Sequence, residues 1–189
     1  LRMIFKNAID YLLILSVPIA VGFLALGDEF IHSLWKVGYN GAISPAKLML
    51  FSLPFIFLAF PTGNLLNAIG RQAHTAVSRV LGLITLTLLD IIFIPLYGLF
   101  GAAAAMILTH CVILFCDLFY LRGIVAQIGK HFVWQIIKVV ASSAFMYAVI
   151  YATKDMFAWY IAAAAGAAAY FFALIVMRGI NLRIIKLLR

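Results

Sequence analysis

Long apolar runs alternate with short polar segments along the whole chain. Six runs can be located, at residues 11–27, 48–69, 80–97, 99–121, 133–153 and 157–177. Each run is long enough to cross a hydrocarbon core of about 30 Å at about 1.5 Å per helical residue. None shows the strict alternation of a membrane β-strand. The pattern predicts an all-α membrane protein, with a six-helix transmembrane domain over residues 1–177 and a short tail over residues 178–189.

Composition agrees with a membrane protein and excludes a soluble domain. Hydrophobic residues make up 67% of the 189 residues and charged residues only 11%, whereas about a quarter of a soluble domain is charged. The net charge of +8 would favour nucleic-acid binding in a soluble protein. Here the basic residues lie just outside the apolar runs, as they do in membrane proteins, so nucleic acid is not an expected partner.

The basic residues are distributed unevenly between the two sides of the predicted membrane. If the N-terminus is cytoplasmic, eleven of the 14 Lys and Arg residues fall on the inner side: Arg2, Lys6, Arg71, Arg79, Arg122, Lys130, Lys138, Arg178, Arg183, Lys186 and Arg189. Three fall on the outer side, namely Lys36, Lys47 and Lys154. This bias predicts a multi-pass membrane protein with both ends of the chain in the cytoplasm.

The tail over residues 178–189 is predicted to be a basic amphipathic segment. Its four basic residues fall in one arc of a helix, with Ile and Leu residues largely opposite. Such a segment lies at the membrane surface and attracts anionic lipid headgroups. Because the chain begins at Leu1 rather than Met, we expect it to be a fragment of a longer protein.

One stretch resembles a known transporter family. Residues 90–105 have the sequence DIIFIPLYGLFGAAAA, which is similar to polysaccharide flippases of the multidrug/oligosaccharidyl-lipid/polysaccharide exporter superfamily. In that family a helix ends at an Ile-Pro-x-Tyr-Gly turn, which Gly-Ala-Ala follows closely. The matching residues here are Ile94, Pro95, Tyr97, Gly98, Gly101, Ala102 and Ala103. Residues 64–71 (NLLNAIGR) and residues 11–22, with Pro18, resemble earlier helices of the family's C-terminal half.

The resemblance implies a bundle of two lobes and twelve to fourteen helices that works by alternating access. It would lie in a bacterial inner (cytoplasmic) membrane, and its substrate would be a polyprenyl-phosphate-linked oligosaccharide for polysaccharide biosynthesis. This chain would form most of the second lobe, and the N-terminal half of the same protein would be its partner. The family often has Asn at the position of Asp90, and Glu or another polar residue at that of His110.

Five polar residues within or near the apolar runs are candidates for function. A carboxylate at the centre of a membrane helix costs about 2.5–3.5 kcal/mol, so Asp90 should face protein or water. Asp90 and His110 are candidates for proton or cation coupling, or for hydrogen bonds that hold helices together. Asn64 and Asn67 are expected to form interhelical hydrogen bonds or line a cavity. Asp117 is interpreted as a residue near the cytoplasmic surface, with a cavity or interhelical role as the alternative.

Three functional classes remain open at this point. The first is a transporter, which includes lipid II and multidrug or cation exporters as siblings of the flippase. The second is a membrane enzyme of envelope sugars, such as a polymerase or acyltransferase, and the third is a scaffold. The sequence contains no Ser-His-Asp set, metal-ligand spacing or glycine-rich phosphate loop, and Cys111 and Cys116 are interpreted as packing residues. It therefore predicts no catalytic residue, metal or cofactor.

The charge bias makes a direct prediction about topology. Reporter proteins fused after Arg71, Arg122 and Arg189 should be cytoplasmic, and those fused at Asn40 and Asp155 should be outside. Reporter enzymes that are active on only one side of the membrane provide the measurement. A cytoplasmic reporter at Asn40 would contradict the predicted number of crossings.

Overall fold

The computed structural model describes residues 2–34, 40–154, 156, 158–177 and 179. The helices in this part of the chain are α1 (Arg2–Leu34), α2 (Asn40–Leu50), α3 (Leu53–Ala68), α4 (Gln72–Tyr97), α5 (Leu99–Tyr120), α6 (Arg122–Thr153) and α7 (Trp159–Val176). Six stretches are long and apolar enough to cross a membrane, and one of them, Ile43–Ala68, combines parts of α2 and α3. The described residues contain no strand. The predicted all-α fold with six candidate spans is therefore confirmed. The predicted tail, residues 178–189, lies outside the described residues except for Gly179.

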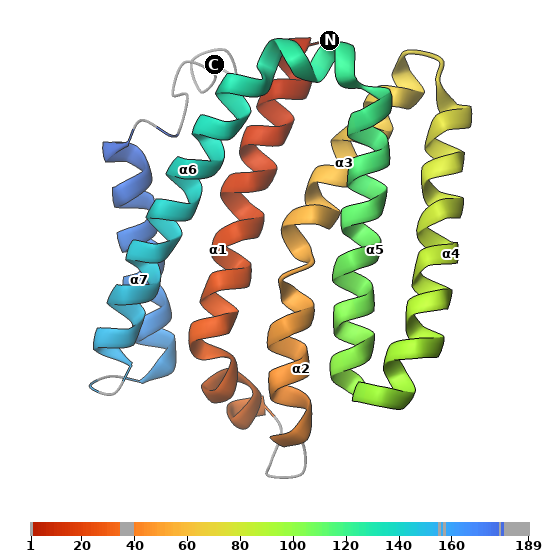
Figure 1. The fold of residues 1–189 in the computed structure, drawn as a ribbon. Helices are drawn as coiled ribbons and strands as arrows, with labels where there is room; N and C mark the ends of the chain where they lie inside the picture. Colours follow the sequence, from red (N-terminus) through yellow and green to blue (C-terminus); the bar gives the residue numbers. More distant parts are fainter. Residues whose placement is uncertain (1, 35–39, 155, 157, 178, 180–189) are drawn as a thin grey trace.

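The helices run up and down between two ends of the bundle (Figure 1). The start of α1, the α3–α4 turn and the α5–α6 junction lie at one end, at the top of Figure 1. We call this the basic end, because Arg71 and Arg122 lie there. The α4–α5 hairpin and the start of α7 lie at the opposite end.

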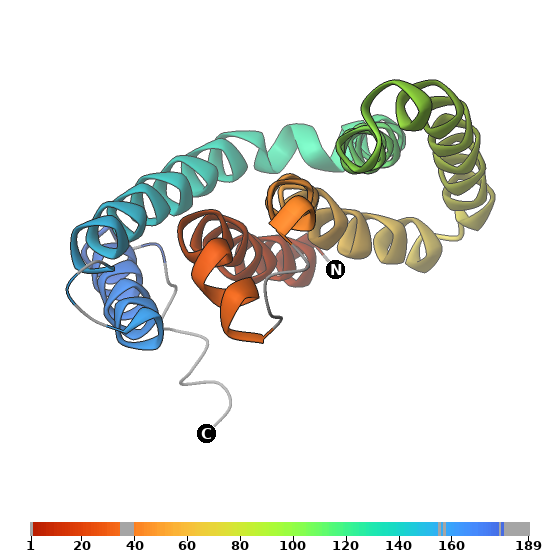
Figure 2. The ribbon, with the colours of Figure 1, turned by 90° about the horizontal axis from the view of Figure 1, so that it is seen from below.

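Seen along the helices, the bundle consists of two rows (Figure 2). One row contains α1 and α3, and the other contains α5 and α6, while α4 and α7 lie at the edges. Buried apolar side chains join α1, α3 and α5 near the basic end: Phe5, Ile9, Leu13, Leu58, Leu65, Leu66, Leu114 and Leu121. Partly buried side chains of α6 pack against this cluster: Ile124, Val125, Phe132 and Ile136. A second cluster joins α1, α6 and α7: Leu26, Val139, Met146, Ile150, Ala162, Tyr170 and Leu174. Contact between α5 and α6 is sparse.

Several helices begin earlier than the apolar runs suggest. The helix α1 already begins at Arg2, α4 begins at Gln72 rather than near residue 80, and α6 begins at Arg122 rather than near residue 133. Hydropathy detects the part of a helix that contacts lipid, whereas a helix continues into polar surroundings as long as its backbone hydrogen bonds are satisfied. The early start of α4 places Arg79 about two turns inside a helix.

A proline inside α1 removes a backbone hydrogen bond, and a side chain from another helix replaces it. Pro18 lies inside α1 and has no N–H to donate to the Ile14 carbonyl four residues earlier. The hydroxyl of the buried Tyr170 on α7 donates to this carbonyl at 2.8 Å. A tertiary contact thus replaces the lost backbone hydrogen bond, which is how membrane helices tolerate proline. The second crossing is divided between α2 and α3 just before Pro54.

The third and fourth apolar runs form a hairpin of α4 and α5, joined at the turn that the family resemblance indicates. Pro95 and Tyr97 belong to the last turn of α4, and the chain reverses at Gly98, whose φ of 58° favours glycine. Gly101 then packs against the backbone of α4, because an added Cβ would lie 2.2 Å from the Phe93 carbonyl oxygen. The hairpin therefore depends on a single reversal at Gly98 and a close contact at Gly101.

This contact predicts a destabilising effect of a single methyl group. Gly101→Ala should lower the free energy of unfolding by about 1–3 kcal/mol, because α4 and α5 must separate to admit the Cβ. Gly123→Ala is the matched control, since an added Cβ there meets nothing within 4 Å. The measurement is the thermal unfolding of the purified protein in detergent. Equal midpoints for the two variants would show that the hairpin tolerates the extra volume.

Candidate functional site

An ion pair between a buried carboxylate and a partly exposed guanidinium joins three helices near the basic end. The side chain of Asp117 on α5 has no exposed area, and its Oδ2 accepts a hydrogen bond of 3.2 Å from Arg79 Nη2 on α4. The Thr62 hydroxyl on α3 donates to the same oxygen at 3.0 Å. Arg79 Nη2 also donates to the Ala59 carbonyl on α3 at 3.2 Å. The charge of a carboxylate that water cannot reach is thus balanced by a guanidinium.

The positions of Arg79 and Asp117 along the hairpin explain why they meet. Each lies nineteen residues from Gly98, one before it and one after it. In an antiparallel hairpin, residues equally distant from the turn lie at the same depth. This symmetry is visible in the sequence, but Arg79 was assigned to the segment before the helix, so the pair was missed.

The structure places Asp117 in the interior rather than at the surface. The interpretation of Asp117 as a surface residue near Arg122 assumed that water reaches the last turn of α5. The side chain instead points into the bundle, where Thr62 and Arg79 contact it. Its Oδ1 is also buried and has no hydrogen-bond partner among the described residues. The alternative role, an interhelical polar contact, is the one consistent with this position.

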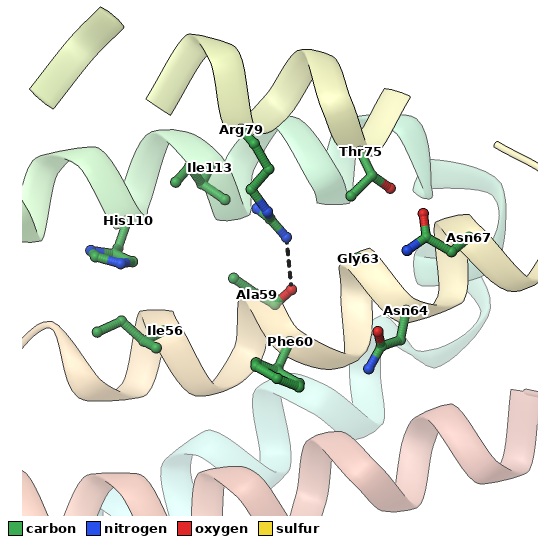
Figure 3. Close-up of a pocket in the computed structure, with 10 residues that line it drawn as sticks. All are labelled: Ile56, Ala59, Phe60, Gly63, Asn64, Asn67, Thr75, Arg79, His110 and Ile113. Carbon is green, nitrogen blue, oxygen red and sulfur yellow. Dashed lines mark hydrogen bonds between the residues drawn. The ribbon is translucent and has the colours of Figure 1, made fainter. Parts of the chain in front are cut away.

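A cavity of about 350 Å³ lies beside the ion pair, between α3, α4 and α5. Its wall is formed by Ile56, Ala59, Phe60, Gly63, Asn64, Asn67, Thr75, Arg79, His110 and Ile113. Figure 3 shows Arg79 reaching from α4 toward Ala59, with His110 at one end of the cavity and Asn67 at the other. A Cβ at Gly63 would lie 2.7 Å from Arg79 Nη2, so glycine leaves room for the guanidinium.

The cavity presents several polar groups that have no partner within the described part of the chain. The side chains of Asn64 and Asn67 are exposed, and no other described residue bonds to them. The Thr75 hydroxyl oxygen is buried and unpaired. A buried polar group without a partner is unusual in a protein and points to a missing water or ligand. Three of the predicted candidates, Asn64, Asn67 and His110, therefore meet at one cavity.

Asp90 lies apart from this cavity and does not bond to His110. Asp90 is eight residues from Gly98 and His110 is twelve, so the two differ in depth by about 6 Å at 1.5 Å per residue. His110 Nδ1 is 2.8 Å from the Met106 carbonyl of its own helix. The Oδ1 of Asp90 is buried and has no partner among the described residues. Coupling by either residue stays a prediction.

A second charged contact between helices was not predicted from the sequence. His131 Nε2 on α6 lies 2.8 Å from Asp10 Oδ2 on α1, with both side chains partly exposed. The two residues are 121 positions apart in the sequence, so no local pattern identifies the pair. The residues of the predicted turn motif, Pro95, Tyr97, Gly98 and Gly101, lie at the opposite end of the bundle from the cavity and do not line it.

No family model, no curated protein and no solved structure matches this chain.

The ion pair predicts a strong dependence of stability on its two members. Arg79→Leu should lower the free energy of unfolding by about 3 kcal/mol, because it leaves the carboxylate of Asp117 buried without a cation. The double variant Arg79→Leu/Asp117→Leu should recover most of this loss, since no uncompensated charge remains. A double-mutant cycle of unfolding in detergent measures the coupling. Additive effects would show that the two side chains do not depend on each other.

Proposed function

We propose that this chain is the second-lobe part of a membrane flippase. The flippase moves a polyprenyl-phosphate-linked oligosaccharide across the inner membrane by alternating access, for polysaccharide biosynthesis. A hydrogen-bonding cavity inside an apolar helical bundle carries this proposal. Its Thr75 hydroxyl is buried without a partner, which costs free energy unless water or a polar ligand reaches it. The exposed amide side chains of Asn64 and Asn67 line the same cavity.

The surroundings of the cavity support an amphiphilic substrate. Asn64 lines the polar cavity and also an apolar groove of about 280 Å³ between α1 and α3. The other residues of this groove are Ile4, Phe5, Ala8, Pro61, Leu65 and Ala68. A ligand with a polar head and a hydrocarbon chain can satisfy both surfaces at once, whereas a small soluble ion satisfies only the first.

The outer surface of α4 supports a larger assembly in a membrane. The buried residues of α4 are Ser78 and Gly82, while Leu83, Leu88 and Ile91 are exposed. An apolar surface of this extent must be covered by lipid or by further helices. The proposed first lobe would supply such helices, and the substrate path would form between the lobes.

Complementation tests the proposed function. The complete polypeptide, which contains this chain and its N-terminal half, should restore surface polysaccharide to a bacterial strain without its own flippase. This chain alone should insert into the membrane but fail to restore it, because the path needs both lobes. Membrane fractionation confirms insertion, and surface polysaccharide is quantified by gel staining. Restoration by the fragment alone, or no transport by the complete polypeptide in proteoliposomes, would contradict the proposal.

A further inference from the structure

The charge of the cavity indicates which part of a substrate it accepts. Among the described residues of the cavity wall, Arg79 is the one with a permanent charge, and Asp117 balances this charge. Because Asp117 neutralises this charge, the cavity wall has no net positive charge to attract a phosphate. The cavity therefore favours a neutral polar group over an anion.

The hydrogen-bonding capacity of the cavity matches a polyhydroxylated ligand. Asn64 and Asn67 each offer a donor group and an acceptor oxygen, and the Thr75 hydroxyl offers both. Arg79 uses Nη2 for Asp117 and Ala59, so its remaining N–H groups can donate to hydroxyl oxygens. Sugar hydroxyls also donate and accept, whereas an ionised phosphate oxygen only accepts.

An exposed aromatic ring at the rim adds an apolar surface. Phe60 lines the cavity, yet 70% of its surface is exposed. An aromatic face can contact the C–H groups on one side of a sugar ring, while the edge of the ring keeps its hydrogen bonds. The volume of about 350 Å³ is at the lower end of the range of about 300–1,000 Å³ for small-ligand sites. The cavity is thus suited to a single sugar ring rather than to a whole oligosaccharide.

We infer that the cavity between α3, α4 and α5 is a sugar-specificity site of the proposed flippase. It binds one uncharged ring of the lipid-linked oligosaccharide, with Phe60 against the apolar face of the ring. Asn67, Thr75 and Arg79 bond to the hydroxyls, and Asn64 lies where the ring meets the apolar groove. The linking phosphate stays outside this cavity. The inference rests on the proposed function for the identity of the substrate, but it concerns recognition and not transport.

Native mass spectrometry of the complete polypeptide in detergent tests the inference, because it resolves bound lipids by mass. The probes are farnesyl diphosphates that carry glucose, galactose or N-acetylglucosamine, and farnesyl diphosphate itself as the sugar-free probe. At least one sugar-bearing probe should bind about tenfold more tightly than farnesyl diphosphate. Asn67→Leu and Phe60→Ala should each remove most of this preference and leave the affinity for farnesyl diphosphate unchanged.

Matched controls separate a local effect from a loss of folding. Asn7→Leu and Phe115→Ala make the same chemical changes at residues that do not line the cavity, so both should retain the preference for sugar. Thermal unfolding confirms that each variant is folded. The inference is overturned if no sugar-bearing probe is preferred, if the cavity variants retain the preference, or if they weaken farnesyl diphosphate equally. Transport in proteoliposomes with unchanged sugar preference in the variants would sustain the flippase and reject the site. A preference for sugar that the cavity variants lose, without transport, would sustain the site and reject the flippase.

Discussion

The burial of one carboxylate constrains the relative positions of α3, α4 and α5. Asp117 has no exposed area, and a buried charge without a partner costs several kcal/mol. Arg79 must therefore come to the same depth on α4, and Thr62 contributes a hydroxyl from α3. In a membrane, apolar helix faces gain little free energy by exchanging lipid for one another, so apolar packing alone does not fix how deep each helix lies relative to its neighbours. The polar contact at Asp117 fixes this relative depth.

The cavity exists because α4 packs closely on α5 but lies further from α3. Where α4 meets α5, Ser78 and Gly82 are buried, and a Cβ at Gly82 would lie 2.5 Å from the Ile113 side chain. These helices therefore pack closely, whereas α4 makes few contacts with α3. The guanidinium of Arg79 bridges this wider gap to the Ala59 carbonyl. The part of this gap that no side chain fills is the cavity, and polar residues line it.

A single polar contact also joins the helices at the other side of the bundle, where α1, α6 and α7 pack together. The carbonyl of Ile14, which Pro18 leaves without its helical partner, accepts a hydrogen bond from Tyr170. Gly166 allows close approach in the same region, since a Cβ there would lie 2.4 Å from the Ile150 side chain. Small residues bring the backbones together, and one hydroxyl fixes their register.

Six candidate membrane spans and the turn at Gly98 could be predicted from the sequence alone, because the length of an apolar run and the conformation of a glycine are local properties. The sequence also identified Asn64, Asn67 and His110, since polar residues in apolar helices are few. Two features emerge only in the folded bundle: Asp117 pairs with Arg79 and Thr62, and Asp90 does not bond to His110. The rotation of each helix about its axis selects these partners. In helices that are apolar on nearly all sides, hydropathy does not specify that rotation, and contacts between distant segments do.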